Sequence, residues 1–430
     1  LHFTIHSFPT RRSSDLNPSQ ILLTCKRLLE QSKLRQESLS QRYLQSFNRI
    51  AQRLREPLSH AEWVALYKEL VRYDLELEGD EGAREILNDQ FRDANRVFGD
   101  FVEDDYADWI ADIGRAPDAE RPVLSHEVVE RYVLPEMERE AGPVIFFVID
   151  CMRYDQWLEF EKLLRPHYDI DFDFYYGILP TATPYARNAI FSGLLPRDMT
   201  ERFPQVWAMA EEDEHSRNQY EEALLHDQLD RHRVDASIRY DKLIATEDGR
   251  TFAQQVSNLT QHDLAAVVVN FVDILAHSRS DSDVIKELAP DEQAYRALTR
   301  TWFEHSWLYD ALRDLARTDA TVVITTDHGA IRSLRSTKVI GDRETSTALR
   351  YKYGRNLKCD EQDAIFVKDP EVFGLPPHNM NTNYIIAKED YYFVYPTNFH
   401  HYERLYRDTM QHGGASLQEM ILPVATMRGK

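Results

Sequence analysis

The sequence predicts an α/β protein with a largely parallel sheet flanked by helices, preceded by an all-α helical bundle. From residue 143 onward, apolar runs of strand length alternate with stretches of helical spacing. Such alternation is typical of parallel sheets, whose strands are buried on their two faces by the connecting helices. Before that point, apolar residues recur every three or four positions and glycine is scarce, which is typical of packed helices.

The helical patterns predict a bundle domain over residues 17–140. Their apolar positions are Leu22, Cys25, Leu28 and Leu29, then Tyr43, Leu44, Phe47 and Ile50, then Trp63, Leu66, Tyr67 and Leu70, and finally Ile86, Leu87, Phe91 and Phe98. A last helix is predicted from Ser125 to about Arg139. This part of the sequence shows no motif that indicates chemistry.

Seven apolar runs predict the strands of an α/β domain over residues 141–430. They cover residues 144–149, 170–176, 265–271, 321–325, 384–387, 392–395 and 420–424. One long helix is predicted between two of these strands, from about residue 291 to 317. The alternating Asp169, Asp171 and Asp173 predict that the second strand lies at an edge of the sheet, with one face in water.

Composition restricts the function classes. The net charge is −21, so the chain would repel nucleic-acid phosphates except where bound metal ions supply local positive charge. Three cysteines without metal-type spacing predict free thiols in a reducing compartment. Because no apolar run approaches the roughly 20 residues of a membrane span, we expect a cytoplasmic protein without membrane insertion. Residues 1–16 resemble translated sequencing-adapter sequence, and we predict that they are a non-native stretch.

Three predicted strands each run into a carboxylate, namely Asp150, Asp273 and Asp327. Ligands of parallel α/β sheets bind at the carboxyl ends of the strands, and a buried anion there needs a partner such as a metal ion. A single Asp after a strand is more often a helix N-cap. Here a histidine accompanies two of the three carboxylates. His277 lies one helical turn after Asp273, and His328 directly follows Asp327. Zinc accepts this mixture of nitrogen and oxygen ligands, although a hydrogen-bonded Asp–His pair is the structural alternative.

Thr183 precedes Pro184, which predicts a helix N-cap followed by proline at the first helical position. The same geometry is a phosphate site, because the N–H groups and the positive dipole end of a helix face the hydroxyl. A late His412-Gly413-Gly414 is a flexible turn that could bring its imidazole to such a site. A plain loop before the last strand is the alternative for this segment.

From about residue 143 to the end, the chain resembles the PglZ domain of the alkaline-phosphatase superfamily. The residues that carry the resemblance are the strand-end Asp, the Thr before Ser192-Gly193-Leu194-Leu195-Pro196, the Asp-x-x-x-His, the Asp-His-Gly and the late His-Gly-Gly. The superfamily nucleophile lies ten residues before the glycine of that turn, which selects Thr183 over Thr181. The resemblance implies an alkaline-phosphatase-like fold and two Zn²⁺ ions. One would be held by Asp273, His277 and His412, and the other by Asp150, Asp327, His328 and the oxygen of Thr183.

The match extends to the PorX family of response regulators of the type IX secretion system. It is carried by residues 149–157 and 186–193, and by helical residues 67–74 and 91–98. This resemblance implies zinc-dependent hydrolysis of phosphodiester bonds in short linear or cyclic oligonucleotides. It also implies a sensor kinase, a sigma factor and the secretion machinery as partners, and a possible homodimer. A receiver domain precedes the bundle in that family, and we expect that it is missing from this sequence.

Further roles remain open for residues near the predicted site. Arg153, Arg187 and Asn188 could bind phosphate oxygens, with Arg187 favoured because it lies one turn after Thr183. The alternative for the two arginines is a salt bridge to Asp155 or to the strand carboxylates. Cys151 is disfavoured as a nucleophile because it follows a buried strand. Two other functions compete with a phosphodiesterase, namely a regulatory adaptor with a vestigial metal site and a phosphomonoesterase.

Overall fold

The fold is taken from a computed structural model of the chain. It describes residues 18–77, 80–114, 120–139, 142–208, 219–244, 246–341, 348–377 and 382–430. The predicted non-native stretch, residues 1–16, lies outside these ranges.

Three long helices form the N-terminal region: α1 (Pro18–Arg53), α2 (His60–Glu76) and α3 (Glu81–Ala111). Ser59 begins α2 with a reciprocal capping box to Glu62, and Asp80 caps α3. Half of the predicted apolar positions in these helices are buried, including Trp63, Leu66 and Phe98.

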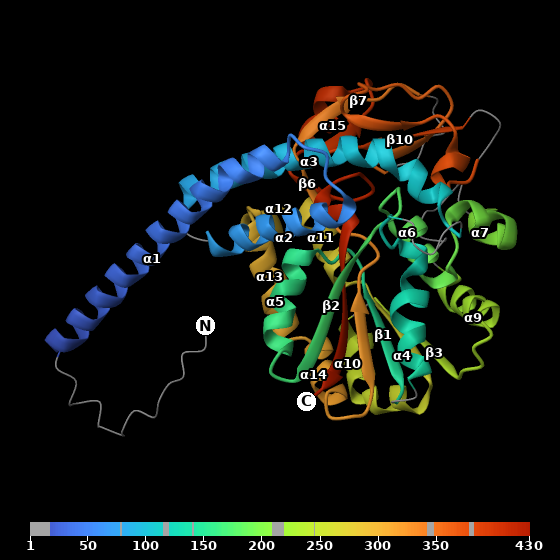
Figure 1. Cartoon of the computed structure of the whole chain (residues 1–430), viewed down its shortest axis with the longest axis horizontal. Coiled ribbons are helices and arrows are strands. Elements are labelled where there is room, and N and C mark those ends of the chain that lie inside the picture. Colours follow the sequence, from blue (N-terminus) through green and yellow to red (C-terminus); the bar gives the residue numbers. More distant parts are fainter. Residues whose placement is uncertain are drawn as a thin grey trace.

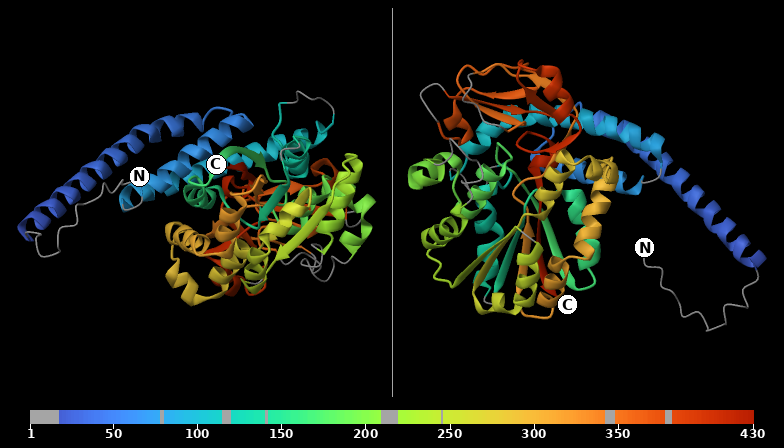
Figure 2. Two further views of the ribbon diagram at one scale, coloured as in Figure 1. Left: turned by 90° about the horizontal axis from the view of Figure 1, so that it is seen from below. Right: turned by 180° about the vertical axis from the view of Figure 1, so that it is seen from behind.

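The first apolar pattern was expected to enter this core, and that expectation is wrong. Leu22, Leu28 and Leu29 are 58%, 55% and 63% exposed. The first half of α1 projects away from the body of the protein, as the front and rear views show (Figures 1 and 2). Helical spacing correctly predicts that a helix forms here, but it does not reveal whether a neighbour covers the apolar face.

The central sheet has six strands in the order β2–β13–β5–β1–β4–β3. Their bounds are β1 Val144–Ile149, β2 Tyr168–Tyr176, β3 Ile238–Leu243, β4 Leu264–Val269, β5 Thr321–Thr325 and β13 Ile421–Gly429. β1 is parallel to its neighbours β4 and β5, β3 is parallel to β4, and β13 opposes β5 and β2. The predicted largely parallel sheet is therefore confirmed, and β2 lies at an edge as expected. β3 was not predicted.

Helices cover the two faces of this sheet (Figure 1). Ile145, Phe147 and Ile149 of β1 point into one hydrophobic cluster together with α5 (Tyr154–Leu164), α13 (Glu292–Glu304) and α14 (Trp307–Leu315). The alternate residues of β1 point into a second cluster with α4 (Leu134–Glu138), α6 (Thr183–Ser192) and α9 (Glu221–Arg231). Period-2 alternation thus buries every residue of β1.

Two predicted helices differ from those observed. The helix expected over residues 291–317 is two helices, because α13 ends at Glu304 and Ser306 caps α14 by accepting from Tyr309 N–H. The helix expected from Ser125 to Arg139 is a 3-10 turn (Ser125–Glu127), a π turn (Val129–Val133) and α4. This irregular segment packs on the sheet, because Val128, Val129 and Val133 belong to the second cluster. The domain boundary at residue 140 stays a prediction.

Smaller elements complete the fold beyond the carboxyl ends of the parallel strands (Figure 1). One is a three-stranded sheet of β8 (Tyr351–Gly354), β10 (Asn383–Ala387) and β9 (Ala364–Val367). The others are two strand pairs. β7 (Arg335–Lys338) pairs with β11 (Tyr391–Val394), and β6 (Ile331–Ser333) pairs with β12 (Thr409–Gln411). The remaining helices are α7 (Pro196–Arg202), α8 (Pro204–Ala208), α10 (Thr246–Gln254), α11 (Phe271–Asp281), α12 (Asp283–Leu288), α15 (Phe399–Tyr406) and α16 (Leu417–Met420). Among the described helices, none combines the length and apolarity needed to cross a membrane.

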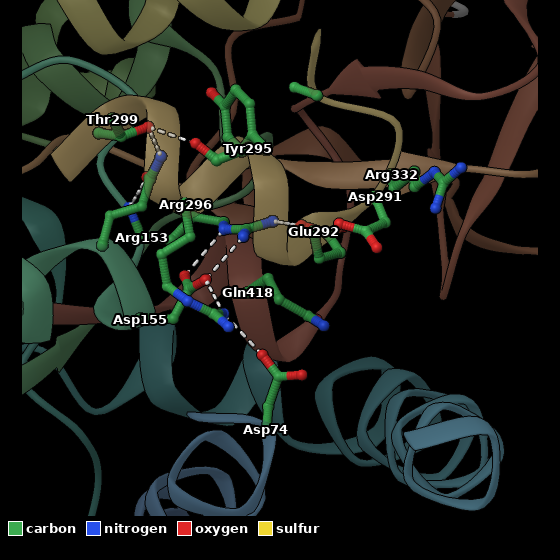
Figure 3. Close-up of polar contacts among 12 residues, drawn as sticks. Asp74, Arg153, Asp155, Asp291, Glu292, Tyr295, Arg296, Thr299, Arg332 and Gln418 are labelled. Atoms are coloured by element: carbon green, nitrogen blue, oxygen red, sulfur yellow. Dashed lines mark hydrogen bonds and ion pairs between the residues drawn. The ribbon is translucent and has the colours of Figure 1, made fainter. Parts of the chain in front are cut away.

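The N-terminal helices pack against the α/β region through a shared core and a buried ionic network (Figure 3). Arg296 of α13 pairs with Asp74 of α2 at 2.6 Å and with Asp155 of α5 at 3.1 Å. Arg153 pairs with Asp155 at 2.8 Å and with Glu292 at 2.6 Å. Arg296 therefore joins the two regions by binding a carboxylate from each.

Removing this arginine is expected to destabilise the protein strongly. Arg296→Ala should lower the free energy of unfolding by about 3–5 kcal/mol, because it leaves the largely buried Asp74 without its ion-pair partner, while Asp155 keeps only Arg153. The matched control is Arg300→Ala, one turn further along α13, where the side chain is 46% exposed and pairs with Glu159; it should cost at most about 1 kcal/mol. Urea unfolding of the two variants measures the difference, and equal losses would show that the network is not stabilising.

Candidate active site

Three adjacent strands bring the predicted carboxylates to one edge of the sheet. Asp150 follows β1, Asp327 follows β5, and Asp273 lies in the first turn of α11 after β4. Because these strands are parallel neighbours, their carboxyl ends meet. A cavity of ≈1040 Å³ opens there, at the upper end of the range of about 300–1,000 Å³ usual for ligand pockets. Its walls include Asp150, Thr183, Arg187, Lys242, Ile244, Asn270, Asp273, Ile274, His277, Tyr351 and His412.

The first cluster consists of Asp273, His277 and His412. Asp273 and His277 are one turn apart on α11, with Oδ1 and Nε2 separated by 3.5 Å. His412 follows β12 and places its Nε2 3.8 Å from the same Oδ1. Burial lowers the pKa of His412 well below its usual range, and the charges of His328 and His277 lower it further. A neutral imidazole is the form that binds metal ions.

The second cluster consists of Asp150, Asp327 and His328. His328 Nε2 lies 3.6 Å from Asp150 Oδ1 and 3.7 Å from Asp327 Oδ2. Burial raises the pKa of Asp150 well above its usual range. Burial acts in the same direction on Asp327, but the charges of His328 and Arg187 outweigh it and hold the pKa of this carboxyl below its usual range. The rings of His328 and His412 stack with centroids 4.1 Å apart, which joins the two clusters.

The side chains present fit metal ions. In each cluster the ligand-type atoms all lie within 4.8 Å of one another. Asp150 Oδ1, Asp273 Oδ1 and His412 Nδ1 are buried and accept or donate no hydrogen bond, which is costly unless another partner binds there. Carboxylate oxygens with imidazole nitrogens are ligands that zinc accepts, and three protein ligands leave a coordination position open. The structure thus assembles the two sets of residues that the family resemblance implied.

Thr183 is the first residue of α6, and Ala182 is its N-cap. The predicted N-cap role of Thr183 is therefore wrong by one position. Its side chain does not cap the helix, and its hydroxyl lies 2.9 Å from His328 Nε2 instead. Thr181 differs, because its hydroxyl donates to Gly414 O at 2.7 Å and accepts from Gly413 N–H at 3.2 Å. Thr181 holds the loop of His412, while Thr183 faces the second cluster.

Two glycines permit the close approaches that shape the site. A Cβ on Gly329, next to His328, would lie 1.9 Å from the carbonyl oxygen of Gln418. Gly413, next to His412, has φ +112° and would place a Cβ 2.6 Å from the ring of Tyr351. Backbone packing at Gly329 and the positive φ at Gly413 thus require glycine in each histidine motif, a need that the sequence pattern alone could not distinguish from flexibility.

The other predicted residues lie away from the open cavity. Arg153 is 3% exposed, pairs with Asp155 and Glu292, and lines a different cavity next to α2 and α3. Asn188 is buried, and its amide donates to Pro184 O at 3.0 Å. This geometry gives no support to substrate binding by either. Burial raises the pKa of the Cys151 thiol well above its usual range, and nearby carboxylates raise it further, which disfavours it as a nucleophile.

Sequence reasoning missed several residues of this cavity. Lys242 belongs to the unpredicted strand β3, and Tyr351 to the unpredicted β8. Ile244 and Ile274 are 60% and 39% exposed and add an apolar wall. Glu221 lies behind the site at the start of α9. Ile274 lies within the Asp-x-x-x-His motif, but the others come from segments without a motif, so no local signal identified them.

The comparison with protein families agrees with this geometry. Residues 128–427 match the family described as the BREX system PglZ alkaline phosphatase-like domain. The chain belongs to this PglZ family of alkaline phosphatase-like domains. Residues 33–110 match the PorX response regulator linker domain, so the two resemblances expected from the sequence are confirmed. No curated protein matches the chain.

Among solved structures, the chain is similar to murine ectonucleotide pyrophosphatase/phosphodiesterase 5, with a TM-score of 0.39, 12% identity, and coverage of 67% of this chain and 88% of that one. It is also similar to phosphonoacetate hydrolase from Sinorhizobium meliloti 1021, with a TM-score of 0.40, 10% identity, and coverage of 66% and 90%. At such low identities and scores, these proteins say nothing about the substrate of this chain.

Proposed function

We propose that this protein is a two-metal phosphodiesterase with Thr183 as its nucleophile, and that the metal is zinc. One observation carries the proposal: the Thr183 hydroxyl faces the second of two adjoining clusters of metal-ligand side chains, at the carboxyl edge of an alkaline-phosphatase-like sheet. Asp273, His277 and His412 would hold one ion, and Asp150, Asp327 and His328 the other. Bound zinc polarises phosphoryl oxygens and favours ionisation of a hydroxyl near neutral pH.

Side chains of this protein orient the reacting groups, and Thr183 accepts the phosphoryl group. Thr183 Oγ1 forms the new bond to phosphorus as the bond to the leaving oxygen breaks, and water then releases the phosphoryl group from Thr183. The positive end of the ten-residue helix α6 lies at this hydroxyl and favours the developing negative charge. Thr181 keeps the His412 loop next to this helix through its two hydrogen bonds to Gly413 and Gly414.

We further propose short linear or cyclic oligonucleotides as the substrates. The cavity combines the clusters with the apolar wall of Ile244 and Ile274 and with Tyr351, which suits a nucleobase beside a phosphodiester. The PorX-type linker supports a role in a response regulator of type IX secretion. Through this resemblance, a sensor kinase, a sigma factor and the secretion machinery are the proposed partners, in the cytoplasm, with a possible homodimer.

The diester preference is tested by comparing nitrophenyl esters with a short oligonucleotide. We expect the purified chain to hydrolyse bis-nitrophenyl phosphate and a dinucleotide faster than nitrophenyl phosphate, because the large open cavity leaves room for a second substituent on phosphorus. The readout is kcat/KM for each substrate. A clear preference for the monoester would assign the site to a phosphomonoesterase. Loaded protein that hydrolyses none of the three would favour an adaptor.

A further inference from the structure

Arg187 lies directly behind the second cluster. Its side chain is fully buried one turn after Thr183. Nε donates to Asp327 Oδ2 at 2.9 Å, and Nη2 pairs with Asp150 Oδ2. On the third side, Nη1 lies 3.6 Å from Glu221 Oε1. Three carboxylates therefore surround the guanidinium, and of its nitrogens only Nη1 makes no hydrogen bond.

Glu221 is itself held from the opposite side. It is 1% exposed at the start of α9, and its Oε2 accepts from Lys242 Nζ at 2.9 Å and from the hydroxyl of Tyr240. Lys242 and Tyr240 belong to β3. The contacts thus form a continuous chain from β3 through Glu221 and Arg187 to the two carboxylates of the second cluster.

This arrangement orients the carboxylates. Arg187 occupies one oxygen of Asp150, while the other, Oδ1, makes no hydrogen bond and lies 3.6 Å from His328 Nε2. The guanidinium charge also offsets the repulsion between Asp150 and Asp327. Hydrogen bonds that orient ligating carboxylates commonly change metal affinity 10- to 100-fold.

We propose that Arg187 is a positioning residue for the second metal ion and that Glu221 supports it. The pair sets the metal affinity of the cluster of Asp150, Asp327 and His328, in place of the substrate-binding role predicted for Arg187. The inference rests on the proposed function, because it requires that this cluster binds a metal ion. It adds Glu221, which lies outside the open cavity, to the residues on which the site depends.

The test is Glu221→Gln, measured as zinc affinity by competition with a chromogenic chelator. The substitution removes a negative charge behind the cluster and leaves the charge of Arg187 less compensated. We expect one of two zinc equivalents to bind about 10- to 100-fold more weakly and the other to be unchanged. The matched control is Glu222→Gln, the exposed neighbour on the same turn of α9, which should bind as the wild type does.

Two further variants locate the effect. His412→Ala weakens zinc binding at the first cluster. In that background, Glu221→Gln should weaken binding of the zinc equivalent that remains, because that ion belongs to the second cluster. Arg187→Lys keeps the charge but cannot bridge three carboxylates, and it should also weaken one equivalent. Zinc affinities equal to those of the wild type in Glu221→Gln and Arg187→Lys, with a raised KM in the latter, would overturn the inference and restore the substrate-binding role. A wild-type chain that binds no metal would instead overturn the proposed function.

Discussion

Replacing Thr183 with alanine is expected to lower kcat by roughly 10⁴- to 10⁶-fold, the scale at which loss of a nucleophile acts in other enzymes. The reason is that the Thr183 hydroxyl lies 2.9 Å from His328 Nε2, beside the cluster that would bind a metal ion. Thr181 cannot substitute, because its hydroxyl is engaged with Gly413 and Gly414. Single-turnover hydrolysis of a dinucleotide measures the loss.

The control for this prediction is Thr183→Ser, which keeps a hydroxyl at the start of α6 and should retain most of the activity. Each cluster contains three ligand-type side chains besides Thr183. Metal content should therefore stay near that of the wild type in each variant. A Thr183→Ala protein that carries metal and still turns over at nearly the wild-type rate would show that the nucleophile is water or another group.

Removing the metal should abolish hydrolysis. We expect about two zinc ions per chain in the purified protein, loss of activity to the uncatalysed background after dialysis against a chelator, and recovery when zinc is restored. The physical reason is that Asp150 Oδ1, Asp273 Oδ1 and His412 Nδ1 are buried without hydrogen bonds, so the site depends on another partner for its order and its charge.

The measurement combines elemental analysis with oligonucleotide hydrolysis at each stage. Recovery with magnesium or manganese but not with zinc would correct the identity of the metal, while the site itself would stand. A thermal unfolding curve of the metal-free protein shows whether lost activity reflects loss of the fold. Hydrolysis that persists in protein shown to be free of metal would contradict the two-metal proposal.

The sequence predicted the strands that carry the site because these strands are buried on their two faces. β1 and β5 have the bounds expected from their continuous apolar runs, and parallel neighbours must bring Asp150 and Asp327 to the same edge. β3 was missed because it is half-buried and carries charges, so its apolar run is interrupted. Leu22 and Leu29 show the converse, since helical spacing predicts a helix whether or not a partner covers it.

By itself, the sequence determined the fold class, the family, and the residue types that meet at the carboxyl edge of the sheet. The reason is that the order of strands and helices along the chain and the spacing of motifs can be read from the sequence directly. Only the tertiary structure decided what each side chain faces. It directs Thr183 to His328 and Thr181 to a loop, and it places Arg187 among Asp150, Asp327 and Glu221. The physical reason is that a charge removed from water needs an oppositely charged or hydrogen-bonding partner. These partners come from distant segments of the chain, so only the tertiary structure shows which ones meet.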